Sequence, residues 1–142
     1  MTSPLENLAG PGKPLHAEPA DTAEVAGLIR SGLARLADAG NPALSMESRF
    51  DLGYNAAHAL CLAALRRAGY RARYRYIVFQ ALPHTLGLPP DVWRVLAKAH
   101  DVRNLAEYEG HVDIEPRLIE DVLVAVRAVA ASLASTAPED IT

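Results

Sequence analysis

The feature that most constrains this chain is the segment from Phe50 to Leu65, which reads FDLGYNAAHALCLAAL and is mostly apolar or small. Built as a helix, it places its polar residues Asp51, Asn55 and His58 within about 60° of one another, in one stripe. Such a helix predicts a central, largely buried position in a helical domain. Because a buried polar group without a hydrogen bond costs about 1–3 kcal/mol, the stripe requires partners, and Asp51 predicts a facing cation.

Length and composition limit the class of protein. A chain of 142 residues fits one domain that buries a core without disulfides or metals. The chain has a single cysteine, Cys61, so no intrachain disulfide can form. Cys61 lies on the apolar face of this helix and is predicted to be buried. There is no signal-peptide core and no apolar run of the ~18 residues that a membrane span requires, which predicts a cytoplasmic protein without a membrane partner. The net charge of −3 argues against nucleic-acid binding by bulk electrostatics.

Helical spacing of apolar residues and the positions of capping residues predict five helices. The expected ranges are 21–40, ending at Gly40; 44–68, closed by a left-handed Gly69; 71–87, broken near Pro83; 89 to a point between 104 and 110; and 116–133. The third range also alternates like a strand. A helix is preferred there because no second strand is evident to pair with it.

The two ends of the chain differ from this helical part. Residues 1–20 contain four prolines and no periodic apolar pattern, which predicts a mobile tail, and residues 136–142 predict a frayed polar tail. Residues 21–135 are then expected to form one all-α domain, a five-helix antiparallel up-and-down bundle with short loops and no sheet.

Arg103 is the expected partner of the polar stripe. It falls in the middle of the apolar stripe of the fourth helix, where a charge is unfavourable unless paired; that stripe consists of Val92, Leu96, Ala99 and Ala106. We therefore expect the second and fourth helices to face each other, with the Arg103 guanidinium on the Asp51 carboxylate and the Asn55 amide oxygen. The same side chains also fit a purely structural network that fixes the register of the helices.

A second basic feature follows the central helix. Five arginines fall within ten residues that contain no acid, interleaved with tyrosines; they are Arg66, Arg67, Arg71, Arg73 and Arg75. Such a segment predicts RNA or phosphate binding by charge and stacking, with a solvated basic turn as the alternative.

The segment HDVRNLAEYEG, read together with GYNAAHALCLAAL, resembles the HEPN superfamily of small α-helical bundles, over roughly residues 22–135. Active ribonucleases of that family carry an Arg followed, after four to six residues, by a His, often with Asn directly after the Arg. Arg103 and Asn104 match the start of this motif. After four further residues comes Tyr108 instead of His, and the next histidine, His111, follows seven. The chain is thus closer to the family branch with Arg-Asn and Ala-Asp/Glu-Tyr, which has no established activity.

The resemblance implies a polar cleft between two copies of the chain, in which Arg103, Asn104 and Tyr108 act on or bind RNA. His58, His100 or His111 would replace the missing histidine as proton carrier, because the phenol of Tyr108 has an ordinary pKa of about 10 and is a poor general base. His58 alone is more often a hydrogen-bonded core residue than a catalyst. No metal-ligand spacing such as HExxH is present, and neither a metal nor another cofactor is expected.

Two functions are compatible with these observations. One is a homodimerising interaction module that associates with RNA or a nucleotide without full ribonuclease activity. The other is a metal-independent endoribonuclease toxin, encoded beside a minimal nucleotidyltransferase as its antitoxin partner. The substitution of Tyr for His and the acidic net charge favour the module.

Overall fold

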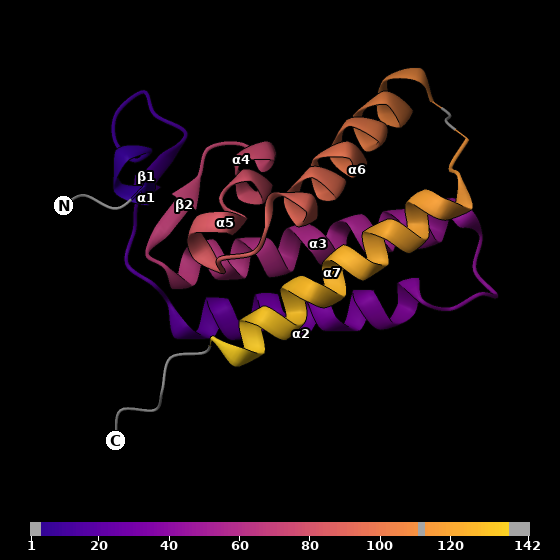
Figure 1. Cartoon of the computed structure of the whole chain (residues 1–142), viewed down its shortest axis with the longest axis horizontal. Helices are drawn as coiled ribbons and strands as arrows, with labels where there is room; N and C mark the ends of the chain where they lie inside the picture. The colour runs from indigo at the N-terminus through magenta and orange to yellow at the C-terminus, as the bar shows by residue number, and fades with distance from the viewer. Residues whose placement is uncertain (1–3, 111–112, 137–142) are drawn as a thin grey trace.

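The computed structural model describes residues 4–110 and 113–136 and is mostly helical (Figure 1). The described residues form seven helices and two short strands. In chain order these are α1 Pro4–Asn7, β1 Leu15–Ala17, α2 Thr22–Ala39, α3 Met46–Arg67, β2 Tyr70–Ala72, α4 Arg75–Gln80, α5 Leu82–Thr85, α6 Pro90–Glu109 and α7 Pro116–Ser135. None of these helices is long and apolar enough to cross a lipid bilayer.

Four long helices lie where the apolar spacing predicts them, and their ends are set by local chemistry. The carboxylate of Asp21 accepts hydrogen bonds from the backbone N–H groups of Ala23 and Glu24 and so caps α2. Ser45 caps α3 in the same way, through the N–H of Ser48. Beyond the other end of α3, Gly69 adopts the predicted left-handed conformation with φ of +94°.

The central helix is α3, as its composition predicts. The helices α2 and α7 both pack along α3, while α6 extends away from the bundle at an angle (Figure 1). The apolar core consists mainly of α3 and α7 side chains, and Cys61 is buried within it as predicted. Gly32 on α2 lies under the Leu60 side chain of α3, so that the two helices approach closely.

The N-terminal residues are packed onto the domain, where the sequence predicted a mobile tail over 1–20. Leu15 is fully buried, and Leu5 joins the same core. Strand β1 pairs antiparallel with β2, in a register that places Leu15 opposite Ala72 and Ala17 opposite Tyr70. The prediction of a tail is therefore wrong for residues 4–17, because two leucines and one three-residue strand are enough to anchor the segment.

The same pairing explains the region that was predicted as one broken helix over 71–87. Its first residues form β2, as their alternation suggested, because β1 supplies the second strand. The remainder forms the two short helices α4 and α5. The prediction of five helices and no sheet is thus corrected, for the residues that the structure describes, to seven helices with a two-stranded sheet. The predicted tail over 136–142 falls, apart from Thr136, outside the described residues.

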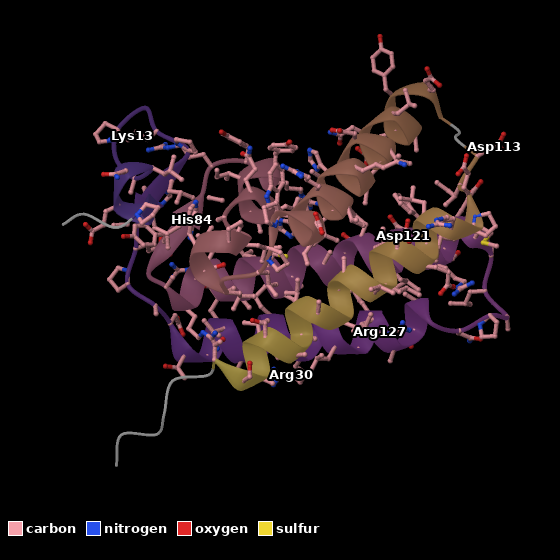
Figure 2. The ribbon with its side chains drawn as sticks, in the orientation of Figure 1. Lys13, Arg30, His84, Asp113, Asp121 and Arg127 are labelled. Carbon is pink, nitrogen blue, oxygen red and sulfur yellow. The ribbon has the colours of Figure 1, made fainter. Side chains whose placement is uncertain are left out.

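The molecule has two distinct ends. The loop carrying Lys13 and the helix carrying His84 lie at one end of its long axis, and Asp113, which follows α6, lies at the other (Figure 2). The candidate functional residues fall into two groups along α3, one toward each end.

Candidate functional site

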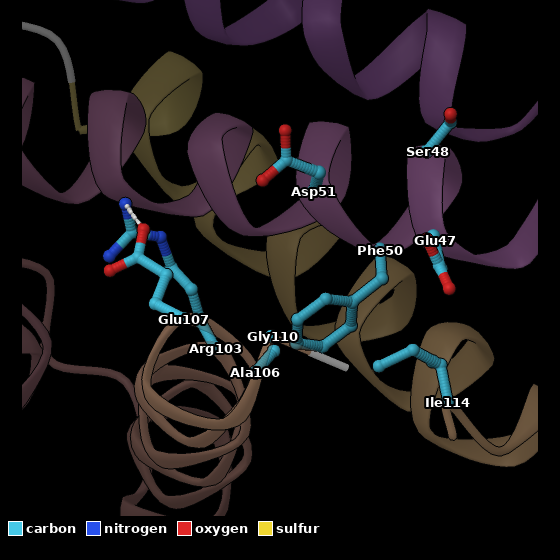
Figure 3. A pocket seen from close by; sticks show the side chains of 9 residues that line it. All are labelled: Glu47, Ser48, Phe50, Asp51, Arg103, Ala106, Glu107, Gly110 and Ile114. Carbon is cyan, nitrogen blue, oxygen red and sulfur yellow. Dashed lines mark ion pairs between the residues drawn. The ribbon is translucent and has the colours of Figure 1, made fainter. Parts of the chain in front are cut away.

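A groove of about 370 Å³ opens between the first turns of α3 and the last turns of α6 (Figure 3). Its apolar part is formed by Phe50, Ala106 and Ile114, and the charged side chains of Asp51, Arg103 and Glu107 line it as well. We call this hollow the α6 groove. It brings together the two helices that sequence analysis expected to face each other.

Within the α6 groove, Arg103 does not bind Asp51. Its Nη2 lies 2.8 Å from the Oε1 of Glu107, one turn further along α6 (Figure 3). Its guanidinium carbon lies 5.1 Å from the centre of the Tyr54 ring, a cation–π arrangement. The predicted Arg103–Asp51 pair is therefore wrong. Glu107 reaches the guanidinium from the same helix, and Asp51 is exposed, so that water can solvate its carboxylate.

Asn55 also stays with its own helix. Its Nδ2 donates to the backbone carbonyl of Asp51 at 2.8 Å. The predicted contact between the Asn55 amide and Arg103 is absent among the hydrogen bonds of the described residues. The polar stripe of α3 therefore lies at the edge of the helix contact and is not buried under a cation.

The polar contact that does join α3 to α6 is made by Tyr54, which is fully buried. Its Oη lies 2.9 Å from Nδ1 of His100, and the other ring nitrogen of His100 lies 3.1 Å from Nδ2 of Asn104. We call Tyr54, His100, Asn104 and Arg103 the Tyr54 cluster. Sequence reasoning did not select Tyr54, although its place one turn from Asp51 and His58 was the available signal.

His58 lies outside this hydrogen-bonded set. Its ring packs at 6.3 Å, edge to face, against Phe79, whose ring centre is also 6.1 Å from that of His100. The pKa of His58 is lowered to about 4, mainly by burial and to a lesser extent by Arg75, Arg103 and His100. Burial is also the main cause that lowers the pKa of His100, against the opposing effect of Asp101. Both imidazoles are therefore neutral at pH 7.

The remaining residue of the predicted catalytic set is not part of the Tyr54 cluster. Tyr108 is 91% exposed near the end of α6. His111 lies outside the described residues. Of the predicted catalytic residues, the structure thus brings together Arg103, Asn104 and His100. Tyr108 and His58 do not take part in the hydrogen bonds of the Tyr54 cluster.

Three of the five arginines proposed to bind phosphate are used inside the fold. Arg66 is buried and donates to Glu24 and to backbone carbonyls. Arg67 donates to the carbonyl of Leu133 and to the hydroxyl of Thr136. Arg71 pairs with the carboxylates of Glu18 and Glu24, at 2.7 and 2.8 Å.

Arg73 and Arg75 differ from the other three because they are exposed, and neither has a carboxylate partner among the described residues. The Nε of Arg73 donates to the carbonyl of Lys13 at 2.6 Å, and Arg75 is exposed with its guanidinium carbon 6.0 Å from the Tyr54 ring centre. Both line a second, smaller pocket on the later turns of α3.

Comparison with known proteins adds no relative to this description. No known family model matches the chain, and neither a curated protein nor a solved structure matches it. Within the residues that the structure describes, no group of three or more His, Cys, Asp or Glu side chains is placed to hold a metal ion.

Proposed function

We propose that this chain is a HEPN-like helical interaction module that forms a homodimer through the exposed end of α6. The observation that carries the proposal is the exposure of two large side chains on that half of the helix: Tyr108 is 91% and Leu105 is 44% exposed. Helix α6 extends beyond the bundle at this point (Figure 1). Aromatic side chains are enriched at protein interfaces because they bury a large area with few rotatable bonds.

A second copy of the chain is the partner that the chemistry of this surface favours. A two-fold interface sets one patch against itself, so the patch must contain complementary features. Here Leu105 and Tyr108 project together from the face of α6 that is turned away from the groove, since they lie roughly half a turn around the helix axis from the residues that line it. The groove on the other side of α6 carries both signs of charge, from Asp51, Glu107 and Arg103. Two copies related by a two-fold axis can therefore bury Leu105 and Tyr108 of one copy against the same side chains of the other.

The experiment is a measurement of molecular mass in solution by light scattering over a wide range of protein concentration. The unmodified chain is expected to be a dimer, and the double variant Leu105→Asp/Tyr108→Asp is expected to be a monomer with unchanged helix content. Tyr74→Asp is the matched control, because Tyr74 is 52% exposed but lies before α4 and not on α6. A monomeric unmodified chain, or a dimer that the double variant leaves intact, contradicts the proposal.

The endoribonuclease remains the second candidate, because the Tyr54 cluster puts His100 beside Arg103 and Asn104 on one face of α6. A neutral imidazole with a ring nitrogen near the surface is suited to accept a proton from an RNA 2′-hydroxyl, and a guanidinium is suited to stabilise the charge that develops on phosphate. The Glu107 carboxylate that already pairs with Arg103 opposes this second role.

Expression in bacteria separates the two functions. The ribonuclease predicts growth inhibition that Arg103→Ala abolishes, and relief of that inhibition by an adjacent nucleotidyltransferase. The interaction module predicts normal growth with either form. The helix content of purified Arg103→Ala serves as the control for folding.

A further inference from the structure

The second pocket is lined by two guanidinium groups, those of Arg73 and Arg75, that pair with no carboxylate of the described chain. It has a volume of about 220 Å³ and lies where the turn between β2 and α4 covers α3. Its cationic wall consists of Arg71, Arg73 and Arg75, its apolar wall includes Leu62 and Val78, and His58 lies between them. The α6 groove is formed by the first turns of α3, so the two sites are separate.

The charges around this pocket are not balanced. Arg66 and Arg71 share the carboxylates of Glu18 and Glu24, so that these four groups together are neutral. The pocket-lining residues include no acid. Arg73 is held by carbonyl oxygens, which position the guanidinium but leave its charge uncancelled. Arg75 likewise has only a ring contact. Two guanidinium charges therefore remain without a counterion at one small site.

His58 adds an uncharged hydrogen-bonding group to this wall. Neither of its ring nitrogens forms a hydrogen bond within the described chain, although its ring is held in place against Phe79. A neutral imidazole carries one N–H donor and one acceptor. The His58 ring is therefore held by packing and keeps hydrogen-bonding capacity that a ligand in the pocket can use.

A phosphate monoester is the ligand class that fits these features. Its tetrahedral dianion matches two uncompensated guanidinium charges, and guanidinium forks bind phosphate oxygens in a bidentate manner. The imidazole N–H supplies a donor from a different direction. The apolar side chains of Leu62 and Val78 offer a surface for the organic part of the ester. A nucleic-acid strand needs a row of free cations along its backbone, and Arg66, Arg67 and Arg71 are already engaged inside the fold.

We propose that this pocket binds the phosphate group of a small phosphate monoester, with Arg73 and Arg75 as the cationic ligands and His58 as a third donor. The site is independent of the proposed dimer and of any RNA cleavage.

Calorimetric titration with phenyl phosphate, inorganic phosphate and a short single-stranded RNA tests the proposal. Phenyl phosphate is expected to bind most tightly, because it offers both a dianion and an apolar ring. Arg75→Gln is expected to weaken that binding about tenfold, the effect of one charge-assisted contact. Arg94→Gln is the matched control, since Arg94 is exposed on α6 and outside the pocket. The control is expected to bind like the unmodified chain.

Nuclear magnetic resonance of the histidine ring protons gives a second readout. A bound dianion next to His58 is expected to raise the pKa of its imidazole from about 4, since negative charge favours the protonated ring. No binding of phenyl phosphate, equal weakening in Arg75→Gln and Arg94→Gln, or binding of RNA alone would each overturn the proposal. None of these results bears on the oligomeric state.

Discussion

Arg66 and Glu24 form the most deeply buried ion pair of the molecule's described part: the Arg66 side chain is 1% exposed, and its Nε lies 2.6 Å from the Oε1 of Glu24. The same guanidinium donates to the carbonyls of Glu18, Pro19 and Tyr70. One side chain at the end of α3 therefore ties together α2, β2 and the segment that leads from β1. Sequence analysis predicted a buried ion pair between Arg103 and Asp51. The structure forms such a pair between Arg66 and Glu24 instead.

Replacing Arg66 by Met is expected to destabilise the fold by about 3–5 kcal/mol, since it leaves buried acceptors without a partner. Urea denaturation followed by circular dichroism measures this loss. Arg30→Met provides the control, because Arg30 is exposed on α2 and its replacement should change stability little. A loss below about 1 kcal/mol in Arg66→Met would show that the network adds little to stability.

Stability is also expected to fall in acid because of Glu18 and Glu24. Hydrogen bonds from Arg71 are the largest cause that lowers the pKa of each carboxyl below 4.5, with a contribution from Arg66. A lowered carboxyl pKa stabilises the fold above the unfolded value, and that stabilisation is lost as pH falls through the folded value. In Glu24→Gln the decline below pH 4.5 should be shallower than in the exposed control Glu109→Gln. Parallel declines in the two variants would argue against this assignment.

The imidazole of His58 is expected to cause a separate loss of stability, at a higher pH than the loss caused by Glu18 and Glu24. Its pKa is about 4 in the folded chain and about 6.5 when unfolded, so the unfolded state binds more protons between these values. The free energy of unfolding should therefore fall by about 2 kcal/mol between pH 7 and pH 5. His58→Leu should remove most of this dependence, whereas His84→Gln, at an exposed position, should retain it. An unchanged dependence in His58→Leu would contradict burial of a neutral imidazole.

Close packing of α2 on α3 makes Gly32 sensitive to any added side chain. A Cβ atom there would lie 2.7 Å from two carbons of Leu60, which is fully buried and cannot swing away. Gly32→Ala is expected to cost about 1–3 kcal/mol in thermal or urea unfolding. Gly27→Ala on the same helix is expected to be neutral or to stabilise by up to about 1 kcal/mol, because a Cβ there meets nothing closer than 3.9 Å. Equal effects at both positions would exclude the close contact as the cause.

The long helices are predictable from sequence because their signals are local. Apolar spacing together with Asp21 and Gly69 predicts the start of α2 and the end of α3 to within a few residues, whereas the end of α6 is predicted only as a point between 104 and 110. The pairing of β1 with β2 is not local, since it joins residues more than fifty positions apart. A three-residue strand in a proline-rich segment shows too short an alternation of apolar and polar residues to be predicted before its partner strand is known.

In the candidate site, too, local features were predictable from sequence and contacts between distant segments were not. Sequence placed α3 against α6 and selected His100, Arg103 and Asn104, which the structure brings together on α6. It could not select the buried cation, because burial of Arg66 depends on Glu18 and Glu24 from distant segments, whereas Arg103 finds Glu107 four residues away. An exposed acid on the same helix turn competes with any partner on another helix.

The central claim is that the ends of α6 from two copies meet, and a distance between two copies tests it most directly. A spin label at Glu109→Cys reports from the residue beside Tyr108. The buried Cys61 has a raised thiol pKa and should not react with the labelling reagent. Pulsed electron resonance should detect dipolar coupling between the two labels, at a distance shorter than for labels at Arg30→Cys on α2. Absence of coupling at position 109, or a shorter distance at position 30, would contradict the proposed interface.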